Sequence, residues 1–231
     1  MLRKNQKQVF TKVLITATIL ALALTLSISA GGQEDKVQIF GKTYVQWSME
    51  WFQWVAAIPA DQNPLFSEGE VDLSIGQDGK VWFLAGSWLG PVVREGTIPA
   101  GKAVFFPIFN LWAYNDPELG ENYTEEELRA MAAGAIDAVS VLSCTVDGKA
   151  LATSANARPK AIVRLQSPAF SYDSEVFGST ELAVMDGYWV MLPSLSEGEH
   201  VIHLEGGIPE WGWMQDITYN ITVVDEDDND D

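Results

Sequence analysis

Trp211 and Trp213 flank a glycine in a segment that also contains Gly206, Gly207 and Pro209. In an extended loop, side chains two residues apart point the same way, so the two indoles would form one aromatic surface. Such surfaces stack on sugar rings or bind apolar ligands. The segment therefore predicts a ligand platform. The alternative is that both indoles fold back and close one end of the core.

Five further side chains are expected to extend this platform if their loops share an end of the domain. The aromatic members would widen the stacking surface, and the polar members would supply hydrogen bonds to a ligand. The expected ligand contacts, the two tryptophans included, are Trp211, Trp213, Trp88, Arg94, Asn110, Trp112 and Tyr114. This set favours a secreted, non-enzymatic binding module for carbohydrate. The alternative without a ligand is a structural cell-surface or envelope protein whose aromatic residues all lie in the core.

His200 and His203 are the two histidines of the chain. They fall in a strand-like run, where residues three apart point to opposite faces. We therefore expect no metal site from this pair, with one histidine facing inward and the other outward. His203 shares a face with Glu205, and these two side chains can contribute to a site that a residue from elsewhere completes.

The sequence lacks the common catalytic motifs: the Gly-x-Ser-x-Gly elbow, His-Glu-x-x-His, and a phosphate-binding glycine loop ahead of a helix. A glycosidase needs only two suitably spaced carboxyl groups. Our candidates are Glu50, Asp116 and Glu118, because neighbouring aromatic residues can raise a carboxyl pKa by desolvation. The alternative function is therefore a polysaccharide-acting hydrolase or lyase, with Glu50 or Asp116 as its acid or base in a cleft beside the first helix.

The charge balance restricts the partners. The chain has 32 acidic and 14 basic residues; without residues 1–30, which hold four basic and no acidic residues, 10 basic residues remain and the net charge is −22. A surface this acidic excludes nucleic acid and docking on anionic membranes. Neutral sugars, basic proteins and cations, calcium included, remain compatible. Residues 225–231 form a solvated acidic tail that lacks the glycine and distal glutamate of a calcium loop.

Residues 1–30 have the pattern of a signal peptide. A basic start precedes the apolar segment Val13–Ile28, and small residues follow, so we expect cleavage after Ala30 and export to the periplasm or the cell exterior. The alternative is an uncleaved membrane anchor. Cys144 is the single cysteine, so no intramolecular disulfide can form. It lies in an apolar run and is expected to be a small buried hydrophobic residue.

Two helices are expected to position these residues. Thr43–Ile58 has bulky apolar residues at three- and four-residue spacing, three of them tryptophans, and Pro59 ends it. This face is expected to pack on a sheet; the alternative is a partly open aromatic wall beside Glu50. The second helix begins at Thr124, where a capping box with Glu127 is expected, and runs to about Leu142.

The remaining elements are expected to be strands. Val81–Leu84 and Val104–Phe106 predict a central pair, joined by a loop that carries Trp88 and Arg94. Val71–Ile75 alternates and predicts a hairpin over 71–85, whereas 111–123 is expected to be irregular. The last third predicts short strands with turns at Asp147-Gly148 and Asp186-Gly187; the strands are 143–146, 161–165, 181–185, 188–192, 200–204 and 217–223.

These elements predict one mostly-β (α+β) domain over residues 36–224. Its fold is expected to be a β-sandwich or a jelly-roll-like domain with two packed helices.

The segment over roughly residues 45–110 resembles a group of exported, uncharacterised bacterial proteins. The matching residues are Glu50-Trp51-Phe52-Gln53-Trp54, Asn63-Pro64, Gln77, Val81-Trp82-Phe83-Leu84-Ala85-Gly86, Ile98-Pro99-Ala100-Gly101-Lys102 and Phe105-Phe106-Pro107. The resemblance implies secretion and a single compact domain, and it brings no known activity or catalytic residues. Many members carry a cysteine pair near the positions of Leu73 and Gly96. Its absence here implies a looser loop around Arg94.

Overall fold

The computed structural model describes residues 37–154 and 158–225 of the 231-residue chain. The predicted signal peptide and nearly all of the predicted acidic tail lie outside the described residues. Among those that are described, no helix has the length and apolar character needed to cross a bilayer.

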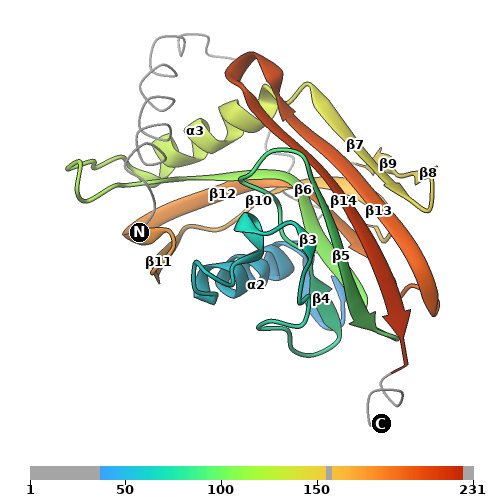
Figure 1. Cartoon of the computed structure of the whole chain (residues 1–231). Coiled ribbons are helices and arrows are strands. Elements are labelled where there is room, and N and C mark those ends of the chain that lie inside the picture. Colours follow the sequence, from blue (N-terminus) through green and yellow to red (C-terminus); the bar gives the residue numbers. More distant parts are fainter. Residues whose placement is uncertain (1–36, 155–157, 226–231) are drawn as a thin grey trace. The chain divides into compact units, whose positions relative to one another are not determined.

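Two six-stranded mixed sheets form a sandwich (Figure 1). The first sheet contains, in spatial order, β4 (Val81–Phe83), β6 (Ala103–Tyr114), β12 (Gly178–Leu192), β10 (Ala161–Gln166) and β9 (Ala152–Ser154), with β11 (Phe170–Ser174) paired to β12. The second sheet contains β3 (Gly69–Glu70), β5 (Val92–Pro99), β14 (Trp213–Val224), β13 (Gly198–Ile208), β7 (Val141–Val146) and β8 (Lys149–Ala150). A separate short pair precedes the first helix and consists of β1 (Gln38–Ile39) and β2 (Lys42–Thr43). The mostly-β, sandwich-like α+β fold with two helices is thus as predicted.

The main core lies between the sheets. Buried residues that alternate along each central strand meet there, among them Val104, Phe106, Ile202, Leu204 and Ile221. Cys144 belongs to this core, as predicted, and burial raises the pKa of its thiol to about 12. The thiol is therefore protonated and inert at neutral pH.

The helix α2 (Tyr44–Ala57) packs on the first sheet, on the face opposite the second sheet (Figure 1). Trp51 is 1% exposed and donates a hydrogen bond from Nε1 to the Leu84 carbonyl oxygen at 2.8 Å, while its ring meets that of Trp189 edge to face. The predicted packing of this helix on a sheet is confirmed. Thr43 caps the helix, and Ile58, just before Pro59, leaves the helical conformation because a residue preceding proline disfavours it.

The helix α3 (Glu125–Asp137) packs on β6 and β12 through Leu128, Ala132 and Ile136. Its capping box between Thr124 and Glu127 is as predicted. The predicted end at Leu142 is wrong, because the chain from Val141 onward pairs with β13 as strand β7.

The Asp186-Gly187 pair is not the predicted turn, since β12 runs straight through it. Asp186 is buried and accepts hydrogen bonds from Arg164 and Gln166 on β10. Gly187 lies so close to Asn110 on β6 that an added Cβ would meet the Asn110 Cβ at 2.6 Å. Both residues thus serve strand packing. The Asp147-Gly148 turn is confirmed, with φ of 51° and 72°.

The predicted hairpin over 71–85 is also wrong. Residues 71–80 form turns, in which Asp72 Oδ1 accepts hydrogen bonds from the Ser74 amide and hydroxyl. The predicted pairing of Val81–Leu84 with Val104–Phe106 is present as parallel strands, but β4 lies at the edge of its sheet. In addition, β6 continues to Tyr114, into the stretch predicted to be irregular.

Candidate functional site

Trp211 and Trp213 lie at the tip of the β13–β14 hairpin. Pro209–Trp211 forms the 3-10 turn η4, and Gly212 follows in the left-handed conformation with φ of 72°. This turn sets the two rings nearly perpendicular, with centroids 5.9 Å apart and an interplanar angle of 81°. Trp211 is 41% exposed, whereas Trp213 is half-buried against the small core of Phe109, Ile136 and Ile208. Among the described tryptophans Trp211 is the exposed one, and the Trp213 ring lies between it and this small core.

Trp88, Trp112 and Tyr114 form a second aromatic group, beside α2 on the outer face of the first sheet. The Trp88 and Trp112 rings stack at 6.4 Å with an angle of 24°, and Phe177 contacts both at 5.5 and 5.1 Å. Trp112 Nε1 lies 3.3 Å from the Tyr172 hydroxyl oxygen, and Tyr172 also meets the ring of Tyr114. Trp88, Trp112 and Tyr172 pack against the α2 core, and Trp213 packs against a different one. The expected platform is therefore two separate aromatic surfaces.

Arg94 lies in the interior, which corrects its expected place in an exposed loop. The connection between β4 and β6 contains β5, which pairs with β14 in the second sheet, and Arg94 is fully buried there. Its guanidinium donates to the carbonyl oxygens of Ser67, Ala85 and Gly86 and to the Tyr219 hydroxyl. Arg94 is thus a structural cation that no surface ligand can reach.

Asn110 is half-buried in the middle of β6, where its Nδ2 lies 3.4 Å from the Met185 sulfur. It faces Gly187 of β12 across the strand pair. The structure therefore places Asn110 in the first sheet and not beside Trp211.

The candidate acids Glu50 and Asp116 belong to separate local networks. Glu50 forms an ion pair with Lys42 and lines an open hollow of about 400 Å³ with Trp47 and Phe83. Asp116 caps the turn that follows β6, where its Oδ1 accepts a hydrogen bond from the Glu118 amide at 2.8 Å. Each carboxylate has a local structural partner, and the two do not form a paired acid and base.

The two histidines face opposite sides of β13, as predicted. His200 shares the inward side with Ile202 and binds Asp147 Oδ2 through Nδ1 and the Ser196 carbonyl oxygen through Nε2, both at 2.8 Å. Burial lowers the pKa of His200, but these hydrogen bonds and the Asp147 charge outweigh it and raise the pKa overall.

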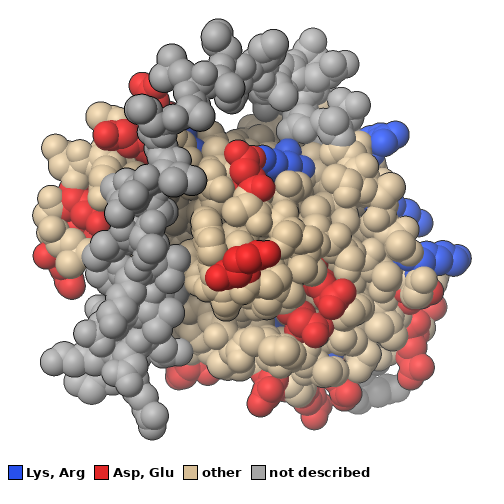
Figure 2. Space-filling model, turned by 90° about the horizontal axis from the view of Figure 1, so that it is seen from above, with Lys and Arg blue, Asp and Glu red and all other residues tan. Residues whose placement is uncertain are grey.

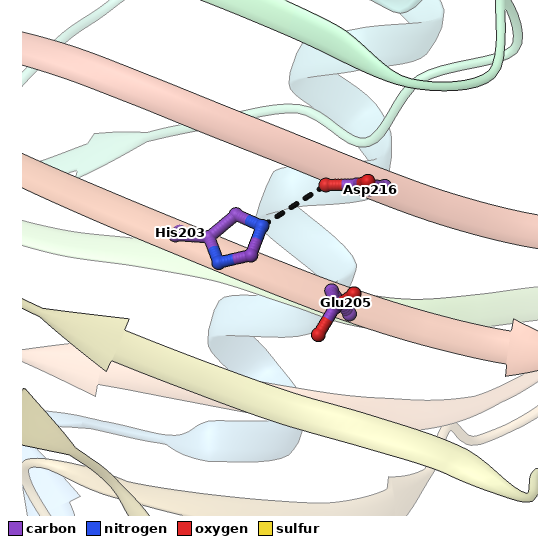
Figure 3. Close-up of side chains that lie close together, drawn as sticks. All are labelled: His203, Glu205 and Asp216. Carbon is purple, nitrogen blue, oxygen red and sulfur yellow. Dashed lines mark hydrogen bonds and ion pairs between the residues drawn. The ribbon is translucent and has the colours of Figure 1, made fainter. Parts of the chain in front are cut away.

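His203 points outward from the second sheet, and its Nε2 lies 3.0 Å from Asp216 Oδ1 on β14. Glu205 stands directly opposite Asp216 in the strand register. One ligand atom from each of the three side chains lies within 4.8 Å of the other two (Figure 3). Ser143 on β7 donates a hydrogen bond to Glu205 Oε2 at 3.1 Å. Residues that could hold a metal thus gather on the two neighbouring strands β13 and β14, and Ser143 on β7 contacts one of them.

Asp216 is the member of this cluster that sequence reasoning did not identify. The signal was present, because counting back from the Ile208–Trp213 pair at the hairpin tip puts Asp216 opposite Glu205. Asp216 also lines an open groove of about 630 Å³ together with Thr218, Val92, Val93 and Glu68.

Comparison with known proteins does not assign the chain to a family. No protein-family model matches the chain, and no curated protein matches it. Among solved structures, the solution structure of amebosin matches with 12% sequence identity and a TM-score of 0.21, over 64% of this chain and 100% of that one. A TM-score this low carries no argument about fold or function.

Proposed function

We propose that the chain is a non-enzymatic binding module that binds neutral carbohydrate at Trp211. The observation that carries this proposal is the exposure of the Trp211 indole at the tip of the β13–β14 hairpin. Exposed aromatic rings that a rigid scaffold holds in place provide stacking surfaces for ligands at little entropic cost. Export follows from the signal peptide that residues 1–30 predict, and we propose that the module acts outside the cytoplasm.

The preorganisation of Trp211 supports the proposal. The Gly212 amide closes the 3-10 turn onto the Pro209 carbonyl oxygen at 2.9 Å. The perpendicular Trp213 ring packs on one side against the core and fixes the angle of its neighbour. A ligand would therefore meet an indole that is already oriented.

The charge distribution supports a neutral ligand. Acidic side chains spread across the visible face of the molecule and outnumber the basic ones (Figure 2). Glu210, beside Trp211, is exposed and can accept hydrogen bonds from sugar hydroxyls. Sulfated or uronic-acid glycans would be repelled by this surface.

The alternative hydrolase or lyase lacks a comparable observation. Retaining and inverting glycosidases place two carboxyl groups about 5–5.5 Å or about 6.5–9.5 Å apart around the sugar. Here Glu50 pairs with Lys42, while Asp116 caps a turn. The structural-protein alternative needs every tryptophan in the core, and Trp211 is exposed.

A glycan array tests the proposal with the wild-type chain and two variants. We expect neutral oligosaccharides to bind the wild type, and Trp211→Ala to bind them more weakly. The matched control is Phe40→Ala, which removes another exposed aromatic side chain, 51% exposed, from a different part of the molecule; it should bind as the wild type does. No binding to any glycan, or equal binding by all three proteins, would refute the proposal.

A further inference from the structure

We propose that His203, Glu205 and Asp216 form a binding site for a divalent transition-metal ion of the zinc class. One imidazole nitrogen and two carboxylates are a donor set that suits zinc and related ions. Calcium prefers six to eight oxygen ligands and does not use imidazole. The histidine therefore selects a transition metal over calcium on this acidic surface.

The distances between the donor atoms are close to those of a tetrahedral ion. Zinc binds nitrogen and carboxylate oxygen at about 2.0–2.2 Å, which places two ligand atoms about 3.4 Å apart. His203 Nε2 and Asp216 Oδ1 are 3.0 Å apart, and the widest separation within the cluster is at most 4.8 Å. The Glu205 carboxylate therefore needs to move by at most about 1.4 Å toward the other two ligand atoms. Its three side-chain torsions allow such a movement.

The backbone places the three residues independently of any ion. β13 is held between β14 and β7, so its ladder hydrogen bonds fix the positions of His203 and Glu205. Asp216 is fixed by the register that puts it opposite Glu205. The Ser143 hydroxyl, from a third strand, holds one oxygen of Glu205, as second-layer hydrogen bonds do for metal-binding carboxylates.

The electrostatics of the cluster favour a cation. Like charges directly opposite each other in an antiparallel pair are destabilising, and Glu205 and Asp216 are such a pair. A divalent ion would neutralise both carboxylates. It would replace the contact between His203 and Asp216, with Nε2 binding the ion and Nδ1 carrying the ring proton.

Three protein ligands leave at least one coordination position to an exogenous group. The groove that Asp216 and Thr218 line is the space beside the cluster from which such a group can approach. This inference does not depend on carbohydrate binding at Trp211, and the experiment below contains no glycan.

The test uses the two histidines as internal reporters. In the NMR spectrum of the untagged chain, the two histidine rings are expected to behave differently as Zn²⁺ is added. The His203 ring signals should shift and saturate at one equivalent, while those of His200 should stay in place. Calcium at the same concentration should leave both rings unchanged. Parallel movement of both rings without saturation, or an equal response to calcium, would overturn the proposal.

Calorimetry on matched variants completes the test. Asp216→Asn and Glu205→Gln should each weaken Zn²⁺ binding at least tenfold. The control is Asp147→Asn, which alters the carboxylate paired with the other histidine and should change the affinity less than twofold. Because Glu205→Gln removes a like-charge contact, the variant should fold at least as stably as the wild type. Equal Zn²⁺ affinity in all variants would show that the ion binds the acidic surface at large.

Discussion

Replacing Arg94 by methionine tests the reassignment of this residue from ligand contact to structural cation. The guanidinium is fully buried and donates to the carbonyl oxygens of Ser67, Ala85 and Gly86. These carbonyls belong to irregular segments before β5, and Tyr219 is paired with Arg94 on the neighbouring strand β14 of the same sheet. Arg94, which lies on β5 of the second sheet, therefore holds the segments that carry these carbonyls against that sheet. Methionine keeps much of the volume and removes every donor.

The expected loss in unfolding free energy follows from the carbonyl oxygens that the substitution leaves without a hydrogen-bond donor. Ala85 O keeps a partner, because the Tyr219 hydroxyl also donates to it at 2.8 Å. The carbonyl oxygens of Ser67 and Gly86 lose their Arg94 hydrogen bonds, and a buried unpaired polar group costs about 1–3 kcal/mol. The total is about 2–6 kcal/mol. Removing the charge also removes its desolvation cost, so we expect a loss of about 2–4 kcal/mol in unfolding free energy.

Equilibrium urea unfolding, followed by tryptophan fluorescence, measures this loss. Tyr219→Phe is the control, since it removes one hydroxyl and leaves the guanidinium bonds to all three carbonyls; its loss should be about 1 kcal/mol. A loss in unfolding free energy below about 1 kcal/mol for Arg94→Met would refute the reasoning. It would mean that the desolvation cost of burying the charge is as large as the stabilisation from its hydrogen bonds.

Three further predictions concern the core, the histidine pair and the turn before β4. Trp51→Ala should lose about 3–5 kcal/mol in urea unfolding, because a buried aromatic side chain is truncated; a loss under about 1 kcal/mol would contradict its place in the core. Desolvation raises the pKa of Asp147, but hydrogen bonds from His200 and the Val201 amide, with the charges of His200 and Lys149, outweigh it and lower the pKa overall. Together with the raised pKa of His200, this makes the pair most stabilising between about pH 4 and 6.5, and the contribution is lost as pH rises through the histidine pKa. Asp147→Asn should therefore lower the melting temperature more at pH 5.5 than at pH 8.5, and equal shifts would contradict the pairing. Leu73 Cγ lies 2.7 Å from the position of a Cβ at Gly96, so with a bond of about 1.5 Å the two Cβ atoms would be at most about 4.2 Å apart, within the disulfide range. The same Cβ would lie 2.8 Å from the Val71 carbonyl oxygen, so the backbone must shift in the oxidised and reduced forms alike. The double cysteine variant should form a disulfide that stabilises the oxidised protein by about 3 kcal/mol over the reduced one, and an oxidised form of lower melting temperature would refute this geometry.

Local signals predicted the elements that depend on local interactions. The start of α2 at Thr43, its end before Pro59 and the capping box of Thr124 with Glu127 can all be read from neighbouring residues. The sandwich also follows, because short alternating strands have few other ways to bury their apolar faces.

The errors arose where distant partners decide the conformation. Asp186-Gly187 has turn chemistry, yet Arg164 binds the aspartate and the close strand β6 requires the glycine. Arginine is a residue type that commonly lies exposed and contacts ligands, but Arg94 is enclosed by three carbonyl oxygens and a hydroxyl from other segments. Neither set of contacts has a sequence signal that spacing or periodicity can reveal.

In the candidate sites too, some features follow from local sequence and others depend on distant contacts. The opposite faces of His200 and His203 follow from strand geometry, and Asp216 could have been placed from the hairpin register. That Trp88 and Trp112 stack together, apart from Trp211, depends on how the segments after β4 pack beside α2.

Titration of the strongest neutral glycan from the array, against the wild type and Trp211→Ala, tests the central claim most directly. Stacking on an aromatic ring is worth about 0.5–1.5 kcal/mol, so the dissociation constant should rise by up to about tenfold. The melting temperature should stay within about 2 °C, because the exposed indole contributes little to the core. An unchanged dissociation constant would show that Trp211 does not bind the ligand, and a large fall in melting temperature would show that Trp211 closes the core.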